Sequence, residues 1–344
     1  MSKVKIVAEI GCNHNGNVEL AKRLVDEAAK AGADAVKFQT FVAEELVSSY
    51  APKADYQKKD NADESQLDMI RKLELTREEY KEVKEYSENL GIEWFSTGFD
   101  MTSIDFLAGL DQQVWKIPSG EITNLPYLEK IRDIHCSNKW IILSTGMSNL
   151  DEIRFAVSVL EKSENTKFTI LHCNTEYPTK DTDMNLRAME VLREEFPKWE
   201  VGLSDHSEGI IASITAVGMG AAFIEKHFTL DKNLPGPDHR ASITPDELKK
   251  LCDGIHRAEK MLGSKEKAVT DSERKNKKVA RKSIVASRNI TKGEELTADN
   301  ITCKRPGNGI SPIHWYDVIG TRANTDFNAD ELIVVDGINW EGDE

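Results

Sequence analysis

The stretch Lys5-Ile-Val-Ala-Glu9 is a short apolar run that ends in a polar residue, and a helical segment separates it from a second such run, Ala35-Val-Lys-Phe-Gln39. Six further runs repeat the unit: Glu93–Thr97, Val114–Pro118, Trp140–Ser144, Phe168–His172, Glu200–Asp205 and Phe223–His227. Buried, β-branched strands that alternate with helices indicate a parallel sheet covered by helices. Eight such units over roughly 250 residues predict a (β/α)8 TIM barrel.

The active site of such a barrel lies at the carboxyl ends of its strands. Here these ends carry an unusual number of polar residues: Glu9, Lys37, Gln39, Thr97, Lys116, Ser119, Glu121, Ser144, Ser204, His206 and His227. Two lysines, two carboxylates and two histidines at one mouth of the barrel predict an enzyme that acts on an anionic substrate.

The composition narrows the class of protein. The chain has 344 residues and a formal net charge of −14, from 59 acidic and 45 basic residues. This charge repels nucleic acid and acidic membranes, so neither is an expected partner, and it favours a cytoplasmic enzyme. The five cysteines form no C-x-x-C pair, which is typical of reduced thiols. The first strand is expected from about Val4, so no signal peptide is predicted.

A change of composition predicts a second domain. Residues 1–263 are expected to form the barrel, and residues 264–281, rich in Lys, Glu, Ser and Asn, to form a linker. Residues 282–344 predict a small β-rich domain that buries little core by itself, with strands at Lys282–Ala286, Glu295–Leu296, Ile301–Cys303 and Glu331–Val335. The polar insert Ser48–Asp68 is long for a barrel loop, which is typical of binding loops.

The two strand-end histidines suggest a metal site. His206 follows the seventh strand and His227 closes the eighth, so their imidazoles can reach one ion. Two histidines completed by water and substrate oxygens suit a borderline divalent metal such as Mn²⁺. The alternative is that each is a hydrogen-bonded core residue. His14, His172 and His239 are further candidate neighbours.

Lys37 and Lys116 are each embedded in an apolar strand, where a lysine is rarely buried without a partner. Converging with the hydroxyls of Thr97, Ser119 and Ser204, they would cradle a phosphate or carboxylate. A Schiff-base role for one lysine is a weaker alternative.

The carboxylates Glu9 and Glu121 have two interpretations. Either can act as a general base or orient a substrate hydroxyl, and either can instead form an ion pair with a strand-end lysine. The residues alone leave this choice open.

Eight motifs in order along the chain resemble the sialic acid synthase family. They are Val7-Ala-Glu-Ile-Gly-Cys-Asn-His-Asn-Gly16, Val36-Lys-Phe-Gln-Thr40, Lys116-Ile-Pro-Ser-Gly-Glu121, Leu143-Ser-Thr-Gly-Met147, Gly202-Leu-Ser-Asp-His206, Glu225-Lys-His-Phe-Thr229, Gly236-Pro-Asp-His239 and Lys304-Arg-Pro-Gly-Asn-Gly309. The bacterial N-acetylneuraminate synthases are the members that the chain most resembles, and the legionaminic acid synthases are near relatives.

The resemblance implies a barrel followed by an antifreeze-like (SAF) domain, in a homodimer whose subunits exchange these domains. It implies that phosphoenolpyruvate condenses with N-acetylmannosamine and that phosphate leaves by C–O cleavage. A 2,4-diacetamido-2,4,6-trideoxymannose is the alternative sugar. A saccharide-binding barrel without catalysis is the distant alternative.

The resemblance also assigns roles to residues. Lys37, Thr97, Lys116, Ser119 and Ser204 match phosphoenolpyruvate contacts, and Ser144 is a further candidate for substrate binding. His206 and His227 match ligands of a divalent metal, Mn²⁺ first and Mg²⁺ or Co²⁺ as alternatives. The sugar contacts match Gln39, Tyr177, Asp238 and, from the C-terminal domain of the other subunit, Arg305.

Overall fold

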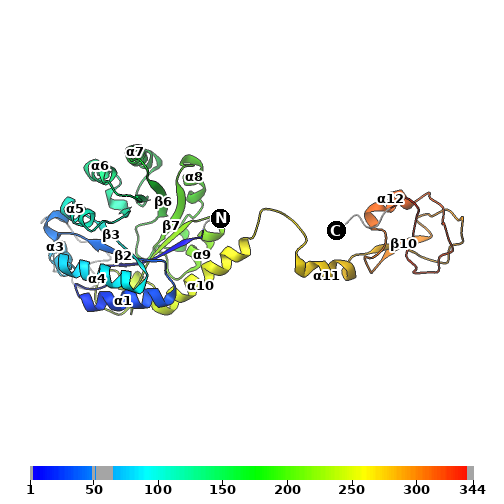
Figure 1. Ribbon diagram of the computed structural model, residues 1–344, viewed down its shortest axis with the longest axis horizontal. Coiled ribbons are helices and arrows are strands. Elements are labelled where there is room, and N and C mark those ends of the chain that lie inside the picture. The colour runs from blue at the N-terminus through cyan, green and yellow to red at the C-terminus, as the bar shows by residue number, and fades with distance from the viewer. Residues whose placement is uncertain (1–2, 49–50, 52–64, 339–344) are drawn as a thin grey trace. The chain divides into compact units, whose positions relative to one another are not determined.

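The computed structural model describes residues 3–48, 51 and 65–338 (Figure 1). The chain divides into two compact units, Met1–Gly263 and Ser264–Glu344. Most of the predicted binding insert, residues 49–50 and 52–64, lies outside the described residues. Within the described part, no helix is both long enough and apolar enough to cross a membrane.

The first unit is built on eight parallel strands, as predicted. In sheet order they run β3-β2-β1-β8-β7-β6-β5-β4. Their bounds are β1 Lys5–Gly11, β2 Ala35–Thr40, β3 Glu93–Gly98, β4 Val114–Ile117, β5 Trp140–Ser144, β6 Lys167–Cys173, β7 Glu200–Asp205 and β8 Phe223–His227. Each predicted run differs from its strand by two residues or fewer at either end.

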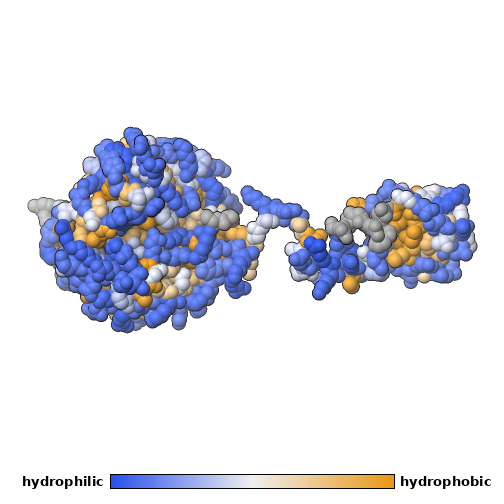
Figure 2. Space-filling view, viewed as in Figure 1, coloured by the Kyte–Doolittle hydropathy of each residue, from blue (hydrophilic) through white to orange (hydrophobic). Residues whose placement is uncertain are grey.

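Helices form the outer layer around these strands (Figure 1), and the face of this layer seen in Figure 2 is mostly hydrophilic. The main ones are α1 Val18–Ala31, α4 Arg77–Leu90, α5 Met101–Gly109, α6 Leu125–Asp133, α7 Leu150–Leu160, α8 Ala188–Glu195, α9 Ile211–Gly218 and α10 Pro245–Leu262, with short α2 Ala43–Leu46 and α3 Gln66–Arg71 after β2. Local sequence sets the ends of α4: Thr76 and Glu79 form a capping box, and Gly91 ends the helix in the left-handed conformation.

The sheet closes on itself between β3 and β4. These two strands stand at opposite ends of the strand order yet contact each other. The side chain of Gln112, which precedes β4, accepts from the backbone nitrogen of Ser96 at 2.8 Å and donates to the carbonyl of Ser96 at 2.9 Å. Among the described residues, the side-chain amide of Gln112 therefore makes the hydrogen bonds to the Ser96 backbone that a neighbouring strand makes at the other positions of the sheet. The predicted TIM barrel is confirmed.

Two apolar layers pack on opposite faces of the strands, because successive side chains of a strand point to opposite sides. The larger layer lies between strands and helices and includes Ile6, Ala8 and Val36. The smaller layer fills the barrel interior and consists of Val7, Ala35, Phe95, Val114, Ile142, Leu171 and Phe223, with Trp140 packed against it. Gly202 occupies the matching position of β7, where a Cβ would lie 2.4 Å from the carbonyl oxygen of Phe223.

The second unit contains an antiparallel pair, β9 Ser283–Ala286 and β10 Ile301–Lys304, with α11 Asp271–Ala280 before it, the turn η5 Pro312–His314 and the short helix α12 Trp315–Val318 after it. Two of the predicted strands match this pair. The other two contribute isolated bridges, at Glu295 and Leu332. The linker prediction did not include α11. The unit also has its own buried apolar cluster, which includes Ile284, Leu296 and Phe327, so the prediction of little core was wrong.

Candidate active site

A polar layer lies directly above the interior apolar layer, toward the carboxyl ends of the strands. On each strand the residue two positions after the interior apolar residue points into the barrel again. These residues are Glu9, Lys37, Thr97, Lys116, Ser144, Cys173, Ser204 and Glu225. All eight are buried. The alternation of the strands therefore places eight polar side chains around one point at the mouth of the barrel.

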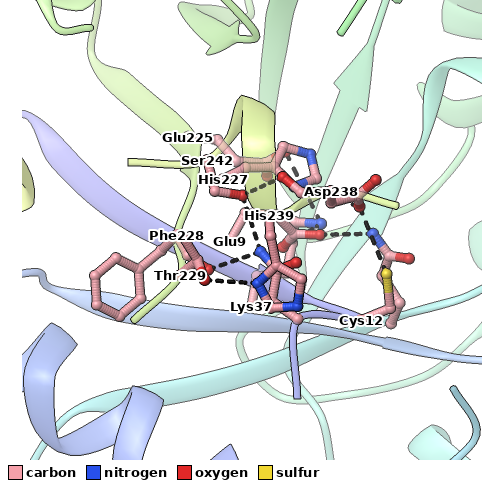
Figure 3. Close-up of polar contacts among 12 residues, drawn as sticks. Glu9, Cys12, Lys37, Glu225, His227, Phe228, Thr229, Asp238, His239 and Ser242 are labelled. Carbon is pink, nitrogen blue, oxygen red and sulfur yellow. Dashed lines mark hydrogen bonds and ion pairs between the residues drawn. The ribbon is translucent and has the colours of Figure 1, made fainter. Parts of the chain in front are cut away.

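Four charged members of this layer form an alternating network. The Nζ atom of Lys37 lies 2.7 Å from Oε2 of Glu9 and 3.9 Å from Oε1 of Glu225. The Nζ atom of Lys116 lies 3.3 Å from the same Glu225 oxygen. Figure 3 shows Glu9, Lys37 and Glu225 converging from neighbouring strands. The network explains how two lysines can be almost fully buried, because each one faces a carboxylate.

The electrostatics of the network distinguish its two carboxylates. Burial raises the pKa of Glu9 to about 7, and the ammonium group of Lys37 opposes the rise. Burial also disfavours the charge on Glu225, but the two lysines outweigh it and hold the pKa of Glu225 below its usual value. Burial lowers the pKa of Lys116, against the attraction of Glu225. Glu225 is therefore the carboxylate held in its ionised form, and Glu9 is the one more easily protonated.

Four hydroxyl groups lie at the same strand ends as the charged network. The hydroxyl of Thr97 accepts from Lys37 at 3.4 Å, and that of Ser204 donates to Glu225 at 3.1 Å. The hydroxyl of Ser119 accepts from the backbone nitrogen of Gly146 at 3.0 Å. The buried hydroxyl of Ser144 has no hydrogen-bond partner within the described structure. A buried polar atom without a partner costs about 1–3 kcal/mol, so this atom fits a ligand contact.

The two strand-end histidines lie side by side, with ring centroids 5.2 Å apart. The Nδ1–H group of His206 donates to the carbonyl of Asn174, so in the neutral imidazole the lone pair is on Nε2. Nδ1 of His227 is buried without a hydrogen-bond partner and lies 3.6 Å from Oδ2 of Asp238. Burial, and then the neighbouring His206, lower the pKa of His227, which keeps its imidazole neutral.

These observations fit a divalent metal ligated by two imidazoles. A metal-binding histidine is neutral and usually donates its other ring N–H to a carbonyl or carboxylate, as His206 does. Within residues 3–48, 51 and 65–338, no group of three or more His, Cys, Asp or Glu side chains is arranged to hold a metal. Water or substrate oxygens would therefore complete the coordination.

A cavity opens beside the histidines. The ring of Tyr177 lies 4.2 Å from that of His206 and 5.6 Å from that of His227, measured between centroids. Asp238 accepts from the thiol of Cys12 at 3.6 Å, a contact visible in Figure 3. Gln39 donates to Glu9 at 2.8 Å. The three predicted sugar contacts of the barrel, Gln39, Tyr177 and Asp238, thus line one cavity.

Two predicted residues are not part of the contacts described for this cluster. Glu121 is half-buried in the turn η2 Ser119–Glu121 and accepts from Asn124 at 2.6 Å, and the described structure shows no ion pair between it and Lys37 or Lys116. Arg305 belongs to the second unit, where its Nε donates to the carbonyl of Ala280 at 3.0 Å.

The three further histidines proposed as neighbours have structural partners elsewhere. His172 contacts the carbonyl of Met184 at 2.7 Å, and His239 contacts the hydroxyl of Thr229 at 2.7 Å. His14 is buried, and its ring stacks on Phe38.

Comparison with known proteins identifies the family to which a chain with this site belongs. Residues 24–267 match the NeuB family, and residues 281–338 match the SAF domain. The chain belongs to the NeuB family. The predicted enzyme class, a phosphoenolpyruvate-dependent synthase of the sialic acid synthase family, is thereby confirmed.

Relatives of this NeuB family member are similar over nearly their whole length. It is 50% identical to the N,N'-diacetyllegionaminic acid synthase of Campylobacter jejuni, over 97% of this chain and 99% of that one. It is 46% identical to the protein of the same name from Legionella pneumophila, over 98% and 93%. The solved N-acetylneuraminic acid synthetase of Leptospira borgpetersenii, in complex with citrate, is 34% identical, with a TM-score of 0.70, over 80% of this chain and 90% of that one.

The sequence interpretation missed one member of the NeuB charge network, Glu225. It considered Glu9 and Glu121 as the lysines' partners, but Lys116 pairs with Glu225. A signal was available: Glu225 stands two residues before His227 on β8, so both side chains point to the same side of the strand. Cys173, whose Sγ lies 3.7 Å from Nδ1 of His206, was also missed.

Proposed function

We propose that this NeuB family member is an N,N'-diacetyllegionaminic acid synthase, which condenses phosphoenolpyruvate with 2,4-diacetamido-2,4,6-trideoxymannose and releases phosphate by C–O cleavage. The observation that carries the proposal is its full-length identity of 50% and 46% to two synthases of that name from different genera. N-acetylmannosamine, the sugar expected first from the sequence, becomes the second candidate. Its support is the more distant synthetase from Leptospira, at 34% identity.

In this proposal the two buried lysines bind phosphoenolpyruvate. Lys37 and Lys116 are the cations of the network. The hydroxyl of Thr97 accepts from Lys37, and the buried hydroxyls of Ser119 and Ser144 lie at the same carboxyl ends of the strands. Phosphoenolpyruvate carries a phosphate and a carboxylate, so two cations with several hydroxyl groups match its charge. Holding the weakly nucleophilic enol carbon against an aldehyde accounts for much of the acceleration, since effective molarities are worth about 7–11 kcal/mol.

Glu9 is the carboxylate best placed for proton transfer in this reaction. It contacts both Lys37, on the phosphoenolpyruvate side, and Gln39, on the sugar side. The side chain of Glu121 accepts from Asn124 and lies farther along the turn after β4. We therefore assign Glu9 to protonation and deprotonation of the reacting oxygens, and Glu121 to the support of the turn.

A divalent metal held by His206 and His227 would polarise the aldehyde of the open-chain sugar. The ring of Tyr177 packs at a tilt of 33° against His206 and edge-on against His227, and these contacts help to orient both imidazoles. We further propose that the enzyme is a homodimer in which Arg305 of each subunit completes the sugar site of the other. A SAF unit that carries an exposed arginine in the Lys304–Gly309 turn supports this assignment.

The test is a comparison of two sugars. Purified enzyme with Mn²⁺ and phosphoenolpyruvate should release phosphate with a higher kcat/KM for 2,4-diacetamido-2,4,6-trideoxymannose than for N-acetylmannosamine. Phosphoenolpyruvate labelled with ¹⁸O at the bridging position should deliver the label to phosphate, because the C–O bond breaks. A higher kcat/KM for N-acetylmannosamine would overturn the assignment of the sugar, and label retained in the sugar acid would overturn C–O cleavage.

A further inference from the structure

The residues that line the cavity beside the histidines fall into two chemically different groups. The volume of the cavity is about 210 Å³. Four lining residues are polar, Gln39, Tyr177, His227 and Asp238, and we call their part of the lining the polar end. Six others belong to one hydrophobic cluster, Cys12, Phe41, Leu46, Ile70, Leu73 and Phe99, and we call them, with the adjoining Met69, the apolar end.

The apolar end is a small hydrophobic cluster in its own right. Cys12, Phe41 and Leu73 are buried, and Leu46, Ile70 and Phe99 pack against them. Among the described side chains at this end, only Cys12 has a hydrogen-bonding group, and its thiol already donates to Asp238. A hydroxyl group that moved from water into this end would therefore find no hydrogen-bond partner among the described side chains there, apart from the Cys12 thiol.

The orientation of a sugar in this cavity follows from the charge network. The aldehyde carbon has to face the enol carbon of phosphoenolpyruvate, which lies where Lys37 holds the anion. Gln39 joins the cavity to that anion site, because it donates to the Glu9 carboxylate that pairs with Lys37. The reacting end of the sugar consequently occupies the polar end of the cavity, and the remote end of the sugar faces the apolar cluster.

We infer that the apolar end is a specificity subsite for a 6-deoxy sugar and accepts its C6 methyl group. The inference rests on the proposed function and names the residues that select its sugar. N-acetylmannosamine carries a hydroxyl group at C6. Burying that hydroxyl without a partner lowers kcat/KM by about 5- to 150-fold, whereas a methyl group gains from leaving water.

Met69 is the residue for the test. It lies on α3, lines the apolar end and is partly exposed, so its replacement leaves the barrel core intact. Met69→Gln keeps the length of the side chain and adds a donor and an acceptor. Met69→Leu keeps the apolar character, and Met261→Gln makes the same chemical change at a 73% exposed position of α10 outside the cavity.

The experiment measures kcat/KM for three sugars: 2,4-diacetamido-2,4,6-trideoxymannose, N-acetylmannosamine and the 6-deoxy analogue of N-acetylmannosamine. The unaltered enzyme should prefer the 6-deoxy analogue over N-acetylmannosamine by about 5-fold or more. Met69→Gln should reduce that ratio at least 3-fold, mainly through KM, while Met69→Leu and Met261→Gln preserve it. Thermal unfolding of each variant checks the fold.

Two other outcomes are distinguishable. If the trideoxy sugar is the best substrate but the 6-deoxy ratio is near one, or survives Met69→Gln, the subsite is overturned and the proposed function stands. If N-acetylmannosamine is the best substrate, the proposed function falls and the subsite falls with it.

Discussion

Removing one lysine from the buried charge network should destabilise the protein far more than removing a surface lysine. In Lys116→Met the Glu225 carboxylate keeps only Lys37, at 3.9 Å, in place of two ammonium groups. A unit-charge attraction across the lost 3.3 Å contact is about 5 kcal/mol at an effective dielectric constant of 20. Breaking one side of a buried pair costs about 3–5 kcal/mol in practice, and we expect that loss in the free energy of unfolding.

A double variant distinguishes the effect of Lys116 on stability from its effect on substrate binding. Lys116→Met combined with Glu225→Gln removes one charge of each sign, so its loss of stability should be smaller than the sum of the two single losses by about 2–3 kcal/mol. The KM for phosphoenolpyruvate should stay raised by about 10- to 150-fold in both Lys116 variants, because a charge-assisted bond to the anion is missing. The KM for the sugar should change far less.

The assay is urea unfolding followed by circular dichroism, together with initial rates of phosphate release. Lys130→Met is the matched control, since Lys130 pairs with Asp105 on the surface at 2.5 Å and such pairs contribute about 0–1 kcal/mol. A loss for Lys116→Met no larger than that for Lys130→Met would refute the buried-network argument. A coupling below about 1 kcal/mol in the double variant would refute it as well.

Three further predictions follow from the described contacts. His206→Ala or His227→Ala should abolish turnover and lower Mn²⁺ affinity measured by calorimetry while the fold is kept; full turnover in chelator-treated enzyme would contradict this. His14→Asn keeps an acceptor for the backbone nitrogen of Gly16, which lies 3.1 Å from Nδ1, but removes a group whose burial lowers its pKa to about 4. Because the unfolded histidine titrates near 6.5, its contribution to stability is complete above pH 6.5 and declines as pH falls toward 4. The variant should therefore lose about 2 kcal/mol less free energy of unfolding than the unaltered protein between pH 7 and pH 5. An unchanged pH dependence of unfolding would contradict this. Mixing inactive Arg305→Ala subunits with inactive His206→Ala subunits should restore part of the activity if the domains are exchanged, and no activity in heterodimers verified by mass would contradict that arrangement.

The strands and the position of the mouth could be predicted from sequence because they depend on local patterns. Each apolar run ends where a polar residue turns into the barrel, and the period of two decides which side chains face inward. Not every ion-pair partner could be predicted in the same way. Glu9 stands opposite Lys37 in the register between β1 and β2, and this pair was among the sequence-based alternatives. Lys116 on β4 instead pairs with Glu225 on β8, and these two strands are not neighbours in the sheet. Such a contact depends on which side chains meet inside the closed barrel, which no single strand encodes.

The second unit shows the opposite case. Its apolar residues are spread over irregular segments, where Ile290 and Phe327 join by an isolated bridge and not by a ladder. Hydrophobic periodicity therefore predicts short strands in this unit and underestimates the apolar core that they enclose.

The amide of Gln112 closes the barrel where β3 meets β4, and this seam has a consequence for the exchange of backbone hydrogens with solvent. The backbone N–H of Ser96 is hydrogen-bonded to the Gln112 side chain. That bond can break by one change of side-chain rotamer, without the separation of two paired strands. Thr97 and Lys116, on the two strands that flank the seam, belong to the proposed anion site. A bound anion would bridge both edges, so phosphoenolpyruvate should slow deuterium uptake at Ser96 more than at the continuously paired strands β5 and β6.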